Sequence, residues 1–242
     1  MHKKFQIKTR QIDILKKNIL SSWLVNEDII NEAEKLYNNI PYHNFLHALR
    51  VTSYVLLLDK SIFSPLEIRS LLIAWLFHDT WHTWDVTTLD EFISLDYFRI
   101  TMDKYPDFLI DDSICRAGII WTVFKNRGKN INKYAKIMAD LDIWDLAMWI
   151  EDFLYYGSLY SLELWVDPEK FYIDVEKWYF KFLMWIDKFI IVSNEVRQVL
   201  PNALKTIKDY YSIDLKTKLE IYNCLLTEDI TLDEFKVKFF NK

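Results

Sequence analysis

Four of the five histidines in this 242-residue chain fall between positions 43 and 82. His43 and His47 are four residues apart, so a helix here would place both imidazoles on one face, roughly 6 Å apart along its axis. His78 and Asp79 are adjacent and follow the apolar run Leu71–Phe77. An imidazole and a carboxylate at the end of a buried helix suit a catalytic divalent cation, because they leave coordination positions open for water and substrate.

A later stretch adds a carboxylate to this set. Asp140 lies in an otherwise apolar pattern of helical spacing, and Asp142 and Asp145 follow it closely. On a helix, Asp142 would point about 200° away from Asp140, so both cannot face one ion. The histidines and carboxylates together predict a metal site, and helical geometry leaves the choice of this aspartate open.

Positive and aromatic side chains near these residues could serve a phosphorylated substrate. Arg50 and Lys136 each lie one helical turn from an expected ligand, so either could face a phosphate group. Trp81 and Trp84 follow the His-Asp pair, where an indole either stacks on a nucleobase or packs in the core. The basic residues of the loop 125–131 are expected to be solvated.

Three motifs occur in a fixed order: Tyr42-His43-Asn44-x-x-His47, His78-Asp79-x-x-His82 and Ala139-Asp140-Leu141. They resemble the HD-domain superfamily of metal-dependent phosphohydrolases over about residues 40 to 145. They look particularly like the cyclic-nucleotide phosphodiesterases and the small predicted HD phosphohydrolases. The last motif favours Asp140 over Asp142. The resemblance implies an all-α HD-domain helical bundle with a first metal shell of His47, His78, Asp79 and Asp140.

The same resemblance implies further roles, with His43 and Asp79 as the expected catalytic residues. His43 matches a general acid that donates a proton to the departing oxygen. Asp79 matches an aspartate that can bridge two metals, the second of which is held mostly by water. His82 is expected to orient a carboxylate or a metal-bound water, and Glu91 to have a weaker supporting role.

The function implied is hydrolysis of a phosphoester by a metal-activated water, in a small nucleotide or nucleotide-like substrate. Diesters and monoesters are both compatible, with one or two divalent ions of Mn, Mg, Co, Zn, Ni or Fe. One alternative is a non-hydrolytic HD-domain sensor of a ligand or metal. Another is an HD-type oxygenase, which is disfavoured because members with larger ligand sets carry two further histidines where this chain has only His82.

Composition indicates the class of protein. The chain has three glycines and five prolines, 51% hydrophobic residues and a net charge of −5. Few glycines favour helices joined by short connections, and the negative charge gives no reason to expect nucleic-acid binding. Cys115 and Cys224 are expected to be buried thiols in a cytoplasmic protein. No signal peptide or membrane span is expected, and a homodimer is compatible with the sequence.

Helix start signals and helical periodicity predict one all-α domain over residues 1–242. It has a core near 26–165 and a C-terminal helical extension near 166–242. Capping boxes begin at Ser64, Thr88 and Thr231, and Asp167-Pro168 starts a further helix. The loops with most room for function are 80–87 and 125–131. The expected helices lie near 10–22, 27–39, 42–59, 65–79, 88–104, 111–125, 131–148, 150–164, 168–192, 195–211, 214–226 and 231–240.

Overall fold

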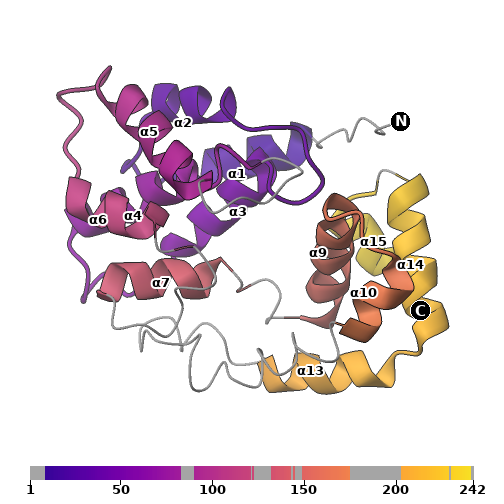
Figure 1. Ribbon diagram of the computed structural model, residues 1–242. Coiled ribbons are helices and arrows are strands. Elements are labelled where there is room, and N and C mark those ends of the chain that lie inside the picture. Colours follow the sequence, from indigo (N-terminus) through magenta and orange to yellow (C-terminus); the bar gives the residue numbers. More distant parts are fainter. Residues whose placement is uncertain are drawn as a thin grey trace.

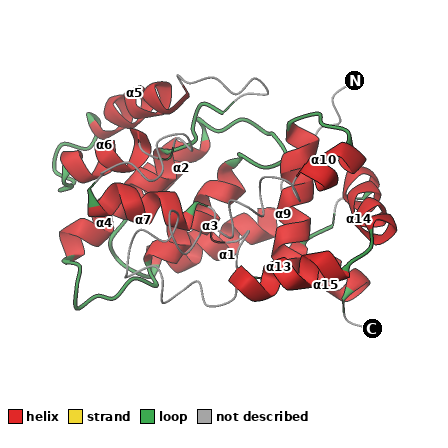
Figure 2. Cartoon of the chain, turned by 60° about the horizontal axis from the view of Figure 1, so that its bottom comes forward, coloured by secondary structure: helices red, strands yellow, loops and turns green. Residues whose placement is uncertain are grey.

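The structure is a computed structural model that describes residues 9–82, 90–120, 122, 132–142, 144, 149–174, 203–228 and 230–240. Within these residues all regular secondary structure is helical and no strand is present, as Figure 2 shows. The prediction of an all-α fold is therefore confirmed. In the same residues, no helix combines the length and the apolar character needed to cross a membrane.

The first group of helices packs around α4 (Figure 1). Every residue of α4 from Ser70 to Phe77 is buried, and a helix that is apolar on all sides belongs inside a core. α3 and α6 make its largest contacts, while α1 packs on α3 and α7 packs on α6. The members are α1 (Thr9–Leu20), α2 (Glu27–Glu34), α3 (Phe45–Val55), α4 (Pro65–Phe77), α5 (Asp90–Met102), α6 (Asp112–Ile120) and α7 (Lys133–Leu141).

The second group of helices packs around α9 and lies beside the first group in Figure 1. α9 contacts all four of its companions, and α10 also packs on α14. The division into a core and a C-terminal extension stays a prediction, although α9 packs mainly with the C-terminal helices. The members are α9 (Ile150–Glu163), α10 (Pro168–Asp174), α13 (Ala203–Ser212), α14 (Leu215–Thr227) and α15 (Leu232–Phe239).

Helix α3 is shorter than the expected helix 42–59, and this changes the position of His43. The side chain of Asn44 accepts hydrogen bonds from the backbone amides of Leu46 and His47, so Asn44 is the N-cap. His43 therefore lies in the turn before α3, not on a helical face with His47. Helix α2 also ends at Glu34, before the expected residue 39.

The capping signals predicted from the sequence are confirmed where the structure describes them. Ser64 and Thr231 both form complete capping boxes, and Asp167 accepts a hydrogen bond from the amide of Lys170 at 2.9 Å. The capping box expected at Thr88 lies outside the described residues, as do parts of the helices expected at 131–148, 168–192 and 195–211. Both cysteines are buried and unpaired, as expected.

Glu67 joins the N-terminal ends of α4 and α7. It completes the α4 capping box by accepting from the amide of Ser64 at 2.7 Å. Its other carboxylate oxygen accepts from Lys133 Nζ at 3.0 Å and from the hydroxyl of Tyr134, both in the first turn of α7. The two helices run in the same direction from this shared start, so their C-terminal ends also come together.

Candidate metal centre

Four side chains from distant parts of the sequence meet at the C-terminal ends of α4 and α7. Nε2 of His78 lies 2.8 Å from Oδ2 of Asp79 and 3.9 Å from Oδ1 of Asp142. Nε2 of His47 lies 3.4 Å from the same oxygen of Asp79 and 3.5 Å from the same oxygen of Asp142. Atoms that each lie about 2 Å from one ion are about 3 to 4 Å from one another. The separations are those of a single coordination site.

Local structure explains why these side chains converge. His47 is in the first turn of α3, behind the Asn44 cap. His78 is the C-cap of α4, and Asp142 is the C-cap of α7. The carbonyl end of a helix carries partial negative charge, which favours a nearby cation. Two helix ends therefore add to the negative potential of the two aspartates.

The donors fit a divalent cation. His47 and His78 are each 1% exposed, and both Nε2 atoms face carboxylate oxygens of Asp79 and Asp142. His78 donates from Nδ1 to the carbonyl of Trp75 at 2.8 Å, which leaves a lone pair on Nε2 facing the carboxylates. Burial works against charging the ring, but the adjacent Asp79 outweighs it and raises the pKa of His78. A site that favours an added proton in this way is a site of negative potential.

The fourth member of the cluster is Asp142, in the place that motif matching gave to Asp140. Asp142 shares the cluster with His47, His78 and Asp79, whereas Asp140 does not belong to it. Asp140 lies inside the last turn of α7 and is 0% exposed. Helix α7 ends at Leu141, so Asp142 is the residue that projects at its end. The geometric argument that the two aspartates face different ways agrees with this arrangement.

Arg50 lies on the far side of His47 from the cluster. Its Nη2 is 2.9 Å from Nδ1 of His47, and its guanidinium carbon is 3.6 Å from the ring centre of Tyr156. Nδ1 and Nε2 are on opposite edges of the imidazole, and Arg50 is only 8% exposed. The expected role of Arg50 toward a substrate phosphate stays a prediction.

His43 reaches the centre from the turn before α3, where it pairs with Glu163 of α9. Glu163 is 1% exposed and accepts from the backbone amides of Tyr42 and His43 at 2.8 and 2.9 Å. Its second oxygen contacts Nδ1 of His43. Burial opposes the charged ring, but the Glu163 carboxylate outweighs it and raises the pKa of His43 to about 9. Sequence reasoning missed Glu163, because nothing near it in the sequence marks it as a partner of a residue 120 positions away.

His82 supports both His43 and Asp79. Its ring stacks on that of His43 with centroids 4.0 Å apart and planes 12° from parallel. Its Nε2 is 3.4 Å from Oδ1 of Asp79, and its Nδ1 is 3.9 Å from Oδ2 of Asp90. Burial, together with the neighbouring His43, lowers the pKa of His82 to about 4. Asp90 is the first residue of α5.

A second group of donors comprises His43, Asp79 and His82, with one atom from each within 4.8 Å of the others. The lone pair of an imidazole nitrogen lies in the plane of its ring. Because the two rings are nearly parallel, their lone pairs do not converge on one point. The second ion implied by the resemblance stays a prediction.

The remaining expected residues lie outside both clusters. Trp81 is 37% exposed, and its ring centre is 5.7 Å from that of Tyr97 on α5. Lys136 is half-buried on α7, and Glu91 is half-buried on α5. Their expected roles toward a substrate stay predictions. Trp84 lies outside the described residues, as do most of the loop 80–87 and the whole of 125–131.

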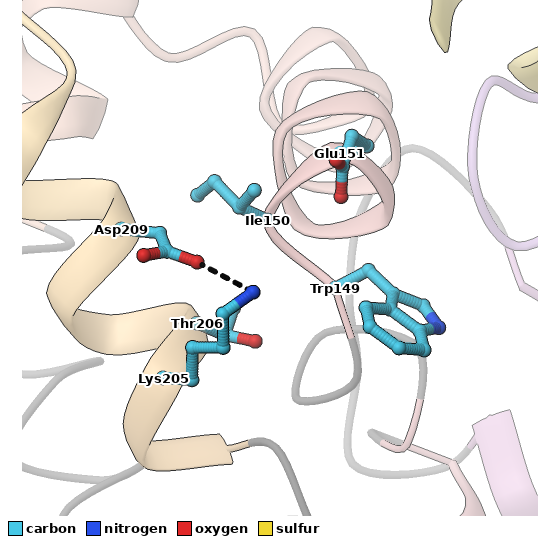
Figure 3. A pocket seen from close by; sticks show the side chains of 6 residues that line it. All are labelled: Trp149, Ile150, Glu151, Lys205, Thr206 and Asp209. Carbon is cyan, nitrogen blue, oxygen red and sulfur yellow. Dashed lines mark ion pairs between the residues drawn. The ribbon is translucent and has the colours of Figure 1, made fainter. Parts of the chain in front are cut away.

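A separate hollow of about 170 Å³ lies between the N-terminal end of α9 and α13. Figure 3 shows it between Trp149 on one side and the Lys205–Asp209 ion pair, 3.5 Å long, on the other. No member of the two donor clusters lines it. It is therefore distinct from the candidate metal centre.

Comparison with known proteins adds no relative. No protein-family model matches the chain, and no curated protein matches it. The resemblance to the HD-domain superfamily therefore rests on the motifs alone.

Proposed function

We propose that this chain is a metal-dependent phosphohydrolase of the HD-domain type, which cleaves a phosphoester of a small nucleotide-like molecule. The observation that carries the proposal is the convergence of His47, His78, Asp79 and Asp142, of which the first three are buried. Two imidazoles and two carboxylates suit a divalent transition-metal ion such as Mn²⁺, Fe²⁺, Co²⁺ or Zn²⁺. When bound, such an ion lowers the pKa of water and offsets negative charge on a phosphoryl group.

His43 is the proposed proton donor. Glu163 holds Nδ1 of His43, so Nε2 is the nitrogen that carries a proton toward the reacting group. The stacked ring of His82 limits the orientations open to His43. A positioned acid of this kind contributes about 10²–10⁴-fold to the rate when the leaving group is poor.

Asp79 and Asp142 have different roles in the proposed site. Oδ2 of Asp79 faces His47 and His78, and Oδ1 of the same residue faces His82. This one carboxylate therefore connects the candidate metal site to the pair of His43 and His82, which positions the proton. Asp142 contributes the second negative charge, which balances the ion before a phosphate group approaches.

The test combines metal analysis with a panel of nucleotide mono- and diesters. Purified wild-type protein is expected to hold a transition metal and to hydrolyse at least one ester. Asp79→Asn is expected to lose both properties. Asp112→Asn, which changes an exposed carboxylate on α6, is the matched control and is expected to keep both.

Two outcomes would contradict the proposal. Turnover that survives Asp79→Asn at full rate would place the chemistry elsewhere. Metal bound by the four side chains with no turnover of any ester would instead support the alternative, a sensor of a ligand or metal.

A further inference from the structure

The contact between Arg50 and His47 constrains where the imidazole can carry its proton. Nη2 of Arg50 lies 2.9 Å from Nδ1 of His47. A guanidinium only donates hydrogen bonds, so Nδ1 of His47 must be the acceptor. In the neutral ring, the proton then lies on Nε2. The position of Nε2 fits this assignment, because carboxylate oxygens of Asp79 and Asp142 lie 3.4 and 3.5 Å from it and can attract the proton.

Metal binding at His47 needs the opposite arrangement. The ion takes the lone pair of Nε2, so the proton of a neutral imidazole moves to Nδ1. Nδ1–H would then point at the N–H group of Arg50, two donors facing each other. The Arg50 hydrogen bond and coordination by a neutral His47 therefore exclude one another.

Arg50 is held in place by more than this hydrogen bond. Its guanidinium carbon lies 3.6 Å from the ring centre of Tyr156 and 6.0 Å from that of Tyr42. A stacked and buried guanidinium does not swing away without losing these contacts. Its permanent positive charge also repels an ion that binds to the same imidazole.

We propose that Arg50 competes with the metal ion for His47, so that an ion is bound only when the Arg50–His47 hydrogen bond is released. This inference rests on the proposed metal centre and adds a determinant of its affinity. Arg50 is thus a positioning residue that weakens metal binding. If Arg50 had a purely structural role, replacing it would damage the site and lower the metal affinity instead of raising it.

The experiment measures Mn²⁺ affinity by calorimetry on the full-length chain after removal of metal with a chelator. Arg50→Met removes the donor and the charge but keeps an unbranched stem against Tyr156. It is expected to bind Mn²⁺ at least about tenfold more tightly, which corresponds to about 1.4 kcal/mol and to the loss of one hydrogen bond from a charged donor. Arg116→Met makes the same change of net charge at an exposed position on α6 and is expected to stay near the wild-type affinity.

A second variant covers the case in which Arg50→Met fails to fold. The amide oxygen of Arg50→Gln can accept from Nδ1–H, so this variant supports the metal-binding form of His47 and is also expected to bind more tightly. Separately, ¹⁵N spectra of the metal-free wild type are expected to show an unprotonated Nδ1 and a protonated Nε2 on His47.

The results separate this inference from the proposed function. If neither wild type nor the variants bind Mn²⁺ or another transition metal, the metal centre and the competition are both wrong. If wild type binds but the folded Arg50 variants bind equally or more weakly, only the competition is wrong. A proton found on Nδ1 of His47 in the metal-free protein would also overturn it.

Discussion

At the scale of single residues, the centre is made of side chains at helix ends. His78 and Asp142 are C-caps, and His43 precedes the N-cap of α3. Helix ends can aim a side chain past the last turn, so residues from different helices reach one point. His47, His78 and Asp79 are buried, and a buried carboxylate or imidazole without a partner is costly. An ion held by His47, His78, Asp79 and Asp142 would offset that cost.

Asp142 and Asp140 make a matched pair for testing the metal ligands. Asp142→Asn is expected to weaken metal binding by more than about 100-fold, since even residues that only support ligands change affinity by about 10- to 100-fold. Asp140→Asn should leave the affinity near the wild-type value and instead lower the unfolding temperature, because its side chain is fully buried. Calorimetric metal titration and thermal melts measure the two effects, and the reverse pattern would restore Asp140 as the ligand.

The His43–Glu163 pair predicts a dependence on the leaving group. His43→Ala is expected to slow a natural ester by about 10²–10⁴-fold and a nitrophenyl ester much less, since a good leaving group needs little protonation. Glu163→Gln should also slow the natural ester more than the nitrophenyl ester, but with a smaller loss of rate. It leaves the His43 ring in place and removes only the negative charge beside it. Rates are compared at equal metal content. An equal loss on both substrates would argue against a proton donor.

At the scale of elements, the ends of α4 and α7 fix the distance between the ligands. Glu67 holds the two helix starts together, and α6 packs against both helices. A metal centre at the far ends depends on this spacing. Substitutions at Glu67 and Gly118 test how stably these helices pack together.

Glu67 predicts a pH dependence of stability. Hydrogen bonds from Tyr134, Ser64 and Lys133 lower the pKa of Glu67 to about 2 from an ordinary 4.5. Since the folded pKa is the lower one, the contribution is complete above pH 4.5 and is lost as the pH falls toward 2. Glu67→Gln is expected to be less stable than wild type in denaturant at pH 7, with the difference shrinking at pH 3. Glu220→Gln, on the exposed face of α14, is the control, and a difference that does not change with pH would contradict the assignment.

The two described helical glycines predict opposite effects of alanine. A Cβ on Gly118 of α6 would lie 3.0 Å from Cβ of Ala74 on α4 and 3.2 Å from Cγ of Met138 on α7, so the helices must move apart. Gly118→Ala is expected to cost about 1–3 kcal/mol of unfolding free energy. A Cβ on Gly157 of α9 would meet no atom within 4 Å, and Gly157→Ala should stabilise by roughly 0.5–1 kcal/mol. Denaturant melts of both variants give the comparison, and a stabilising Gly118→Ala would show that the α4–α6 contact is looser than described.

At the scale of the whole molecule, the sequence predicts local features well and distant pairings poorly. Helical periodicity and capping residues such as Ser64 and Thr231 indicate the fold class and most described helices, because these signals act within one or two turns. His47, His78 and Asp79 stand out by type and spacing. Glu163 does not, because its pairing with His43 depends on how α9 packs. Helical geometry left Asp140 and Asp142 open, and motif matching favoured Asp140 because it ignores where a helix ends, whereas Asp142 is the one that joins the cluster.

The most direct test of the account is a crystal structure of the full chain grown with Mn²⁺ and recorded with anomalous scattering. The account predicts an anomalous peak about 2.0–2.3 Å from Nε2 of His47, Nε2 of His78 and carboxylate oxygens of Asp79 and Asp142. Arg50 should then no longer donate to Nδ1 of His47. No peak at this position, or a peak bonded to Asp140 in place of Asp142, would contradict the proposed centre.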